Sequence, residues 1–366
     1  METQLRGYKF RIYPNKEQKI IINKILGSCR FVYNHFLAVR RDEWKANKKS
    51  ISYVDTCKLL TTLKRYDEFS WLKEAENTAM QQSLRDLDKA YKNFFKKKSG
   101  YPRFKSKHSH AQSYRTVEHI HLYETKIKLP KLTPIKIKVS RQINGRIKNA
   151  TITHTASDKY FVSLCVEEEL VYKPNKGNTV GIDVGIKEFY TDSNGNTVNN
   201  PKYLKKYEKK LAREQRRLSR KMPRSNNGKK QRIKVARVYE KITNCRKDFL
   251  NKESTKLVHE NQMIAIEDLK ISNMMKNHKL AKAIADVSWY EFFRQLEYKA
   301  IIYNSKIVKI PTYYPSSQTC SVCGYQNPIT KNLSVREWDC PKCNIHHDRD
   351  YNAAKKYQKR RFENLK

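Results

Sequence analysis

The chain has 366 residues and a formal net charge of +41, from 77 Lys and Arg residues against 36 Asp and Glu residues. This length is enough for two or three domains with their own hydrophobic cores. So large a positive excess calls for a polyanionic partner such as nucleic acid, because phosphate contacts neutralise it and release counterions. No run of about 18 apolar residues exists, which excludes a membrane-spanning helix.

The cysteines do not form the pattern of a disulfide framework. Four of the eight occur in two tight pairs, and the other four are scattered at Cys29, Cys57, Cys165 and Cys245. The N-terminus also lacks the apolar segment of a secretion signal. We therefore expect a protein of the reducing bacterial cytoplasm, associated with the nucleoid and not with a membrane.

The opening of the chain combines a strand with a block of helices. Residues 5–14 alternate apolar and polar side chains and predict a short strand that stops at Pro14. Apolar residues then recur at helical spacing from Lys16 to about Tyr66, and a further helix is predicted from Thr78 to Lys97. The basic turn "KKKSGYPRFKSK" that follows should lie at the surface.

Residues 130–170 predict a small β-barrel. Their apolar and polar residues alternate around Asn144-Gly145, which is a strong signal for the turn of a hairpin. The stretch "KYFVSLCVEEEL" predicts another strand. The strand near Tyr8 could belong to the same barrel, which would make the helical block an insertion.

The next segment predicts a strand that carries a carboxylate among apolar residues. Asp183 is surrounded by Val180, Ile182, Val184 and Ile186, and Ser193-Asn194-Gly195-Asn196 predicts a turn back into a hairpin. From Pro201 to Lys256, 21 basic and five acidic residues accompany apolar positions that suit two long helices broken at "PRSNNGKK". This basic surface is either a solvated face or a nucleic-acid groove.

Two further acids lie at the edges of predicted elements. The strand "QMIAIEDLK" ends at Glu267, and Asp350 in "HHDRDYNAAKKY" precedes a helix that should start near Asn352. Taken singly, the acids could cap a turn, pair with a lysine or cap a helix. Together they follow the element order of an RNase H-like domain, with a last strand at "KIVKIPTYY".

The chemistry of magnesium explains why three such acids would converge. Mg²⁺ prefers carboxylate, water and phosphate oxygens, and two ions about 4 Å apart can activate a water and stabilise the leaving oxygen of a phosphodiester. An acid inside an apolar strand would then stay ionised. We predict that Asp183, Glu267 and Asp350 are catalytic residues that bind two Mg²⁺ ions.

The two cysteine pairs predict a structural zinc site. Cys320 and Cys323 are separated by sixteen residues from Cys340 and Cys343, which is the spacing of a four-cysteine zinc ribbon. Four thiolates leave no open position for catalysis. The neighbouring His346 and His347 could compete as ligands, although four cysteines suffice.

Several stretches together resemble one family over nearly the whole chain. The chain is similar to TnpB, the transposon-encoded RNA-guided DNA nuclease related to type V CRISPR effectors. The resemblance is carried by "YKFRIYPNKEQKIIINKILGSCRFVYNHFL", "RDLDKAYKNFFKKKSGYPRFKSK", "GIDVGIKEF", "AIEDLK", "SWYEFFRQLEYKA", "YYPSSQTCSVCG" with "CPKC", and "HDRDYNAA". The family motif places the catalytic Asp two residues before Asn-Ala-Ala, which selects Asp350 over Asp348.

The resemblance implies an α+β multidomain fold. A split β-barrel (an OB-like wedge) would receive a helical insertion, and an RNase H-like RuvC nuclease domain of α/β type would carry the zinc ribbon. The expected segments are the opening strand of the wedge barrel (1–14), a helical recognition lobe (15–110), the remainder of the wedge barrel (111–174), the RuvC domain (175–313), the zinc ribbon (314–347), which would contact target nucleic acid, and the RuvC C-terminal helix (348–366).

The resemblance also implies an activity and partners. One protein would bind one structured guide RNA from the end of the mobile element and cut double-stranded DNA next to a short motif, which the barrel and the helical lobe would read. Alternatives are a nuclease-inactive RNA-guided repressor, a direct RNase H-like DNA transposase, and a zinc-ribbon DNA-binding protein with a coincidental triad. The presence of all three acids disfavours the repressor. The split barrel and the ribbon's place before Asp350 disfavour the transposase.

Overall fold

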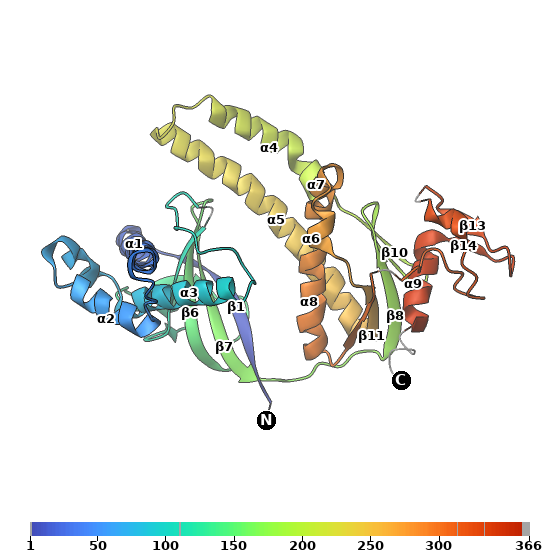
Figure 1. Cartoon of the computed structure of the whole chain (residues 1–366), viewed down its shortest axis with the longest axis horizontal. Coiled ribbons are helices and arrows are strands. Elements are labelled where there is room, and N and C mark those ends of the chain that lie inside the picture. Colours follow the sequence, from blue (N-terminus) through green and yellow to red (C-terminus); the bar gives the residue numbers. More distant parts are fainter. Residues whose placement is uncertain (1, 110, 313, 333, 361–366) are drawn as a thin grey trace. The chain divides into compact units, whose positions relative to one another are not determined.

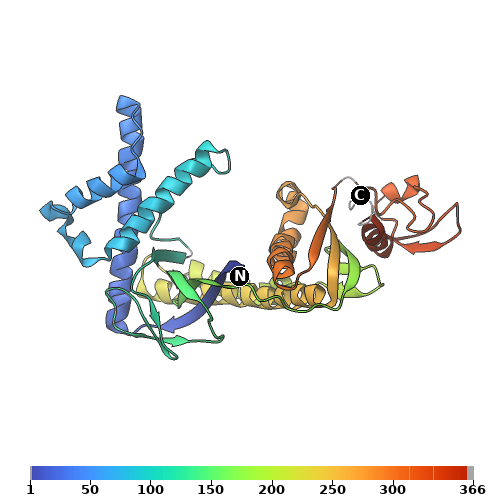
Figure 2. The ribbon, with the colours of Figure 1, turned by 90° about the horizontal axis from the view of Figure 1, so that it is seen from below.

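The computed structural model describes residues 2–109, 111–312, 314–332 and 334–360. The chain divides into two compact units, Met1–Leu170 with Asn226–Ala236 and Val171–Ser225 with Arg237–Lys366. Figures 1 and 2 show the elements of both units in two views. No helix in the described ranges is both long and apolar enough to cross a bilayer.

The first unit is built on a curled, antiparallel seven-stranded sheet in the order β2-β6-β7-β1-β5-β4-β3. Its strands are β1 (Thr3–Tyr13), β2 (Ala111–Thr116), β3 (His121–Leu122), β4 (Lys126–Lys128), β5 (Ile135–Lys138), β6 (Arg146–Thr155) and β7 (Tyr160–Glu169). Strand β1 pairs with both β7 and β5. The prediction that the first strand joins the later strands is therefore confirmed.

The predicted hairpin at Asn144-Gly145 is wrong. Strand β5 pairs with β1 and β4, whereas β6 pairs with β7 and β2, so the strands that flank the turn are not neighbours. Gly145 instead lets its own backbone lie close to that of β7, because a Cβ atom there would lie 2.4 Å from the carbonyl oxygen of Glu167. The glycine of this dipeptide is therefore required by packing against a distant strand, and a local turn signal does not reveal such packing.

Helices between β1 and β2 share one hydrophobic core with this sheet. They are α1 (Lys16–Asn47), α2 (Tyr53–Leu63), a 3-10 helix (Asp67–Glu74) and α3 (Asn77–Phe95). The region predicted as helical up to Tyr66 contains two α-helices, each begun by a capping box, Asn15 with Gln18 and Ser52 with Asp55. Buried side chains such as Phe36 and Leu87 pack with those of the strands.

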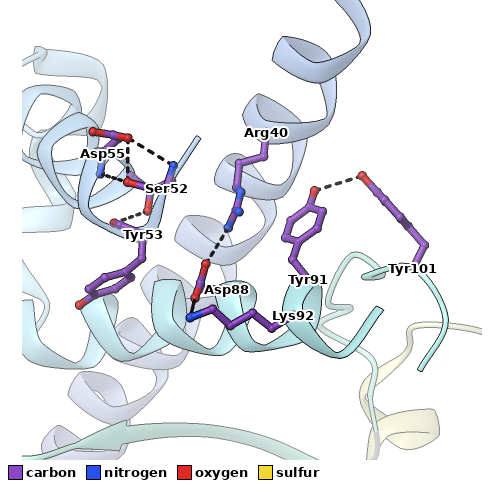
Figure 3. A network of polar contacts seen from close by, with 9 residues as sticks. Arg40, Ser52, Tyr53, Asp55, Asp88, Tyr91, Lys92 and Tyr101 are labelled. Atoms are coloured by element: carbon purple, nitrogen blue, oxygen red, sulfur yellow. Dashed lines mark hydrogen bonds and ion pairs between the residues drawn. The ribbon is translucent and has the colours of Figure 1, made fainter. Parts of the chain in front are cut away.

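Polar contacts also join α1 to α3, and α3 to the chain that follows it (Figure 3). Asp88 on α3 lies 3.6 Å from Arg40 on α1 and 2.8 Å from Lys92. The Arg40 guanidinium stands 4.3 Å from the ring centre of Tyr91, whose hydroxyl lies 3.0 Å from that of Tyr101. The basic turn after α3 is thus attached to the helices through Tyr101.

The second unit contains a mixed five-stranded sheet in the order β10-β9-β8-β11-β12. Its strands are β8 (Asn178–Val184), β9 (Glu188–Asp192), β10 (Thr197–Asn199), β11 (Asn261–Glu267) and β12 (Lys306–Ile310). Strands β8, β9 and β10 are antiparallel, which confirms the turn at Ser193–Asn196. Strand β11 is parallel to both β8 and β12.

The helices of this region of the chain are α4 (Tyr203–Ser219), α5 (Asn226–Glu260), α6 (Ile271–Met274), α7 (His278–Val287), α8 (Trp289–Ile302) and α9 (Arg349–Arg360). The two long helices predicted between Pro201 and Lys256 are confirmed as α4 and α5. Helix α9 begins before Asn352 and contains Asp350 in its first turn. The C-terminal helix was predicted to Lys366, and residues 361–366 lie outside the described residues.

Short elements surround the cysteine pairs. A 3-10 helix (Pro328–Lys331) precedes a two-stranded sheet of β13 (Glu337–Asp339) and β14 (His346–Asp348), and α9 follows β14 directly. Trp338 on β13 packs with Cys320 and Cys340 in a small core of its own. The cysteine region is therefore tied in sequence to the start of α9.

Helix α9 crosses β8 at Gly181. A Cβ atom on Gly181 would lie 2.1 Å from the carbonyl oxygen of Ala354 and 2.6 Å from the backbone nitrogen of Gln358. We expect Gly181→Ala to destabilise the protein by roughly 1–3 kcal/mol, because the backbone of α9 has to move away. Calorimetric unfolding measures this loss.

Gly27→Ala is the control, since Gly27 lies inside α1 with nothing within 4 Å of the added Cβ. Alanine there should keep or raise stability, by up to about 1 kcal/mol. Equal melting temperatures for wild type and Gly181→Ala would contradict the close approach.

Candidate active site and metal centre

The sheet brings two of the predicted acids to one edge. Asp183 lies near the end of β8 and Glu267 is the last residue of β11. The strands are parallel and pair in a register that sets Ile182 opposite Ile266, so the residues that follow leave the sheet at the same side. Tertiary structure thus places side by side two acids that the sequence separates by the whole of α4 and α5.

The third acid reaches this edge on a helix. Asp350 is in the first turn of α9, which packs on β8, β9 and β11. The charges of Asp350 and Glu267 both raise the pKa of Asp183, which places the two acids near it. The structure therefore brings together the three acids that the sequence singled out.

The environment of the acids disfavours their charged forms. Burial, followed by the charges of Asp350 and Glu267, raises the pKa of Asp183 well above its usual value. Burial also raises the pKa of Glu267 and that of Asp350, although nearby Arg336 opposes the latter. Arg349 also lowers the pKa of Asp183 and of Asp350, yet burial prevails and the pKa of all three carboxyls stays raised. A bound cation would supply further positive charge.

The donor set fits a hard cation. Carboxylate oxygens are the ligands that Mg²⁺ prefers. Over the described ranges, the four cysteines are the one group of at least three Asp, Glu, His or Cys residues whose ligand atoms all lie within 4.8 Å of one another. Among the described residues, the three acids do not form such a group.

Sequence reasoning missed two side chains that contact these acids. Arg336 Nη1 donates a hydrogen bond to Asp350 Oδ1 at 3.3 Å. The hydroxyl of Tyr357 donates to Glu267 Oε2 at 3.2 Å. A signal for Tyr357 was available, since it lies seven residues, or two helical turns, after Asp350 on the same face of α9. No spacing rule would have found Arg336.

Asp348, the alternative to Asp350, has a local partner. Its Oδ1 accepts a hydrogen bond from the backbone nitrogen of Tyr351 at 2.8 Å, as a capping side chain does at the start of a helix. Arg349 is turned toward the cysteine region, where Nη1 donates to the carbonyl oxygens of Thr330 and Asn332, both at 3.0 Å. Asp348 therefore caps the start of α9 from the preceding residue.

The four paired cysteines converge on one point. The Sγ atoms of Cys320 and Cys343 lie 3.6 Å apart, and those of Cys323 and Cys340 lie 3.5 Å apart. All four are free thiols. A closed set of four sulfur ligands is the arrangement that a structural Zn²⁺ takes.

Each cysteine pair sits on the same kind of turn. Cys320 donates its backbone N–H to the carbonyl of Tyr325, as Cys340 does to Ile345. The residue after each pair, Gly324 or Asn344, has a positive φ, of 78° and 54° respectively. Glycine and asparagine adopt this left-handed conformation most readily, which explains their place in the two turns.

The two histidines near the cysteines differ in position. His347 is buried, and its Nε2 lies 3.1 Å from Cys320 Sγ. His346 is exposed, and its Nδ1 lies 2.9 Å from Asp339 Oδ1. His347 is therefore the one beside the sulfur cluster, and the group of ligand atoms within 4.8 Å of one another contains the four cysteines alone.

Comparisons with known proteins agree with this architecture. A family model described as "Probable transposase" matches residues 163–278, and one described as "Cas12f1-like, TNB domain" matches residues 289–357. A helix-turn-helix model matches residues 1–49, a range that contains β1 and the single long helix α1. The match therefore identifies relatives, whereas the local fold is a strand and a helix.

Two relatives match nearly the whole chain. A protein from Streptomyces pristinaespiralis named "Putative RNA-guided DNA endonuclease" is 40% identical over 359 residues, 97% of this chain and 89% of that protein. The protein of Escherichia coli K12 with the same name and the suffix InsQ is 35% identical over 370 residues, 96% of this chain and 91% of that protein.

The fold has a match among solved structures. Cas12f1 in a complex with single guide RNA and target DNA superposes with a TM-score of 0.58 at 14% identity, covering 97% of this chain and 99% of that one. The class of protein is thus that of Cas12f1-like folds, with mixed α/β structure, a curled sheet and a four-cysteine cluster. The chain belongs to the TnpB-like family of RNA-guided DNA endonucleases, which confirms the resemblance in sequence.

The raised pKa of Asp183 predicts a pH dependence of stability in the absence of divalent ions. Between the pKa of the unfolded chain and the raised pKa, the folded state binds a proton that the unfolded state does not bind, so stability rises as pH falls through this window. Asp183→Asn should be more stable than wild type at neutral pH, and the two should converge as pH is lowered. Thermal unfolding in chelator checks both; parallel curves for the two proteins would refute the shift.

The cysteine cluster predicts a metal content. We expect one zinc per wild-type chain, and much less in Cys340→Ser, whose thermal stability should also fall because the turn around Cys340 loses its ligand. Mass spectrometry of the metals checks this. Cys245→Ser is the control, because Cys245 lies on α5 outside the cluster. Unchanged zinc in Cys340→Ser would remove that cysteine from the ligand set.

Proposed function

We propose that the protein is a metal-dependent, RNA-guided DNA endonuclease of a mobile element. It binds a structured guide RNA and hydrolyses both strands of target DNA beside a short motif. The observation that carries the proposal is the convergence of Asp183, Glu267 and Asp350 at one sheet edge, where the charges of the other two raise the pKa of Asp183. The names of relatives that match nearly the whole chain support the guided activity.

The three carboxylates would hold two Mg²⁺ ions. When bound, Mg²⁺ activates a water and stabilises charge on the leaving 3′ oxygen, so the products carry 5′-phosphate and 3′-hydroxyl ends. Arg336 adds a positive charge beside Asp350, on the side of the centre that the cysteine region contributes. This guanidinium opposes the rise in the pKa of Asp350 and so favours its ionised, ligating form.

The zinc ribbon would act as a structural support for α9. Asn352 on α9 accepts a hydrogen bond from the backbone nitrogen of Ser321 and donates to the carbonyl oxygens of Ser316 and Thr319. These partners flank Cys320. Zinc bound to the cysteines would therefore hold the chain that positions Asp350, in addition to any contact of the ribbon with target nucleic acid.

The arrangement of domains is consistent with two separate tasks, selection of the target sequence and binding of the nucleic-acid backbones. Base pairing with the guide selects the sequence, and basic surfaces hold the backbones. In this proposal the seven-stranded sheet and its helical insertion would be the split wedge barrel and the recognition lobe. The five-stranded sheet, with three antiparallel strands and two further parallel ones, would be the RNase H-like RuvC domain.

The first unit offers a place where the adjacent motif would be read. A cavity of about 470 Å³ is lined by residues at the start of α3 and around β3 and β4, among them Glu76, Thr78, His119 and Lys128. Glu76 is buried, and its Oε1 accepts hydrogen bonds from Thr78 and Thr116. Hydrogen-bonding groups such as these can contact base edges, while basic residues of the same unit contact the neighbouring phosphates.

A direct DNA transposase is the second candidate, favoured by the description of the family model over residues 163–278. RNase H-like acids can also transfer strands. The products separate the two functions, because the nuclease leaves free ends and the transposase joins a strand to a new site. Purified protein with Mg²⁺ and labelled element ends therefore distinguishes them.

The nucleic acid that co-purifies with the protein tests the guided function. Expression with the natural downstream DNA should yield one discrete RNA, with a structured scaffold that ends at the element boundary. Sequencing identifies it and supplies the guide for cleavage assays. A heterogeneous mixture, or DNA alone, would contradict guided function and leave an unguided nuclease or a transposase.

Loss of Asp183 should separate cleavage from binding. Asp183→Ala removes a ligand of the metal centre without touching the basic surfaces, so we expect a fall in cleavage of more than ~10³-fold, about 4 kcal/mol in the transition state, and unchanged guided binding. Cleavage and gel-shift assays with the same guide measure both. Substantial cleavage by the variant would contradict the assignment of Asp183 to the metal site.

A further inference from the structure

The acidic centre contains a tyrosine that the sequence patterns leave without a role. Tyr357 lies on α9 and is 2% exposed. Its hydroxyl donates to Glu267 Oε2 at 3.2 Å and accepts a hydrogen bond from Ser316 Oγ at 2.9 Å. One buried hydroxyl thus joins Glu267 to Ser316.

The polarity of this chain of hydrogen bonds follows from its ends. In its ionised, ligating form Glu267 can only accept, so the single proton of the phenol points to Glu267 Oε2. The oxygen of Tyr357 is then free to accept, and Ser316 donates to it. Ser316 therefore orients the phenol, and the phenol occupies one oxygen of Glu267.

We propose that Tyr357, oriented by Ser316, is a positioning residue of the metal centre: its hydroxyl holds Oε2 of Glu267 and leaves the other oxygen to a divalent cation. The inference deepens the proposed function and rests on it. Partners of this kind fix the orientation of a ligating carboxylate, and their loss typically costs about 10- to 100-fold in metal affinity or activity.

The ring and the hydroxyl of Tyr357 have separate surroundings. The ring belongs to a core with Ala265, Val308, Ile310 and Ala353, which anchors it through apolar contacts. Phenylalanine would keep those contacts and lose only the hydroxyl. Tyr357→Phe is therefore a clean test of the hydrogen bond, and Ser316→Ala is a second variant that keeps the phenol but removes its orienting donor.

A matched control exists in the same unit. Tyr190 is also 2% exposed, and its hydroxyl donates to Glu253 Oε2 at 3.1 Å. Tyr190→Phe removes the same chemical group from the same kind of buried Tyr–Glu pair without touching Asp183, Glu267 or Asp350. It measures what the loss of such a bond costs in stability alone.

The first readout is binding of Mn²⁺ to the full-length protein, followed by the electron paramagnetic resonance of free Mn²⁺. The Asp183→Ala variant defines Mn²⁺ that is bound elsewhere. Tyr357→Phe should weaken the Asp183-dependent binding by about 10- to 100-fold, and Ser316→Ala should weaken it less. Tyr190→Phe should bind like wild type.

The second readout is the Mg²⁺ concentration for half-maximal cleavage by the protein with its guide RNA. It should rise in Tyr357→Phe, while the rate at saturating Mg²⁺ approaches that of wild type and binding of target DNA is unchanged. If Tyr357→Phe and Tyr190→Phe lose similar stability and neither alters Mn²⁺ binding, the hydroxyl only satisfies a buried group and the inference is overturned. A wild-type protein that does not cleave would contradict the proposed function, whereas the Mn²⁺ measurement would still decide the role of Tyr357.

Discussion

The close packing of α9 across β8 is the contact on which the acidic centre depends. Gly181 lets the two backbones approach, and Gln358 Nε2 donates to the carbonyl oxygen of Thr179 at 2.8 Å on the same strand. A larger residue at position 181 would meet backbone atoms of the helix, which cannot turn aside as a flexible side chain can. The distance of Asp350 from the two strand-borne acids is thus set by a glycine.

The cysteine cluster and the acidic centre are connected through the start of the same helix. Strand β14 ends at Asp348, α9 begins at Arg349, and Arg349 and Asn352 bond to backbone groups around the cysteine turns. A metal bound to the cysteine cluster would therefore also limit the movement of Asp350. This connection gives a structural reason for the insertion of a four-cysteine segment directly before the third acid.

The electrostatics of the protein combine two opposite demands. The chain carries a net charge of +41, which suits nucleic-acid backbones. Yet it gathers three carboxylates at one edge, where burial raises the pKa of each and the charges of Asp350 and Glu267 raise that of Asp183 further. Arg336 is the basic residue that forms a described ion pair with one of them. The general positive charge is therefore a property of the surface, and the centre keeps a local negative charge that suits small cations.

Repeating and local patterns were determined by the sequence alone. The alternation around Asp183, the apolar run before Glu267 and the two long helices all appear in the structure, because hydrophobic periodicity follows the geometry of a strand or a helix. The cysteine turns could be predicted equally well, since the spacing within each pair reflects a local loop that can bind one ion. The family could be recognised because its motifs cover nearly the whole chain.

Pairings between distant segments were decided only by the tertiary structure. The sequence around Asn144-Gly145 indicated a hairpin, but β7 and β1 separate the two strands, and the glycine serves a contact with Glu167. The contacts of Arg336 with Asp350 and of Tyr357 with Glu267 likewise join residues whose chain separation carries no periodic signal. A pattern in sequence reports the environment of one element, whereas these contacts depend on which elements pack together, and that choice is made by the whole core.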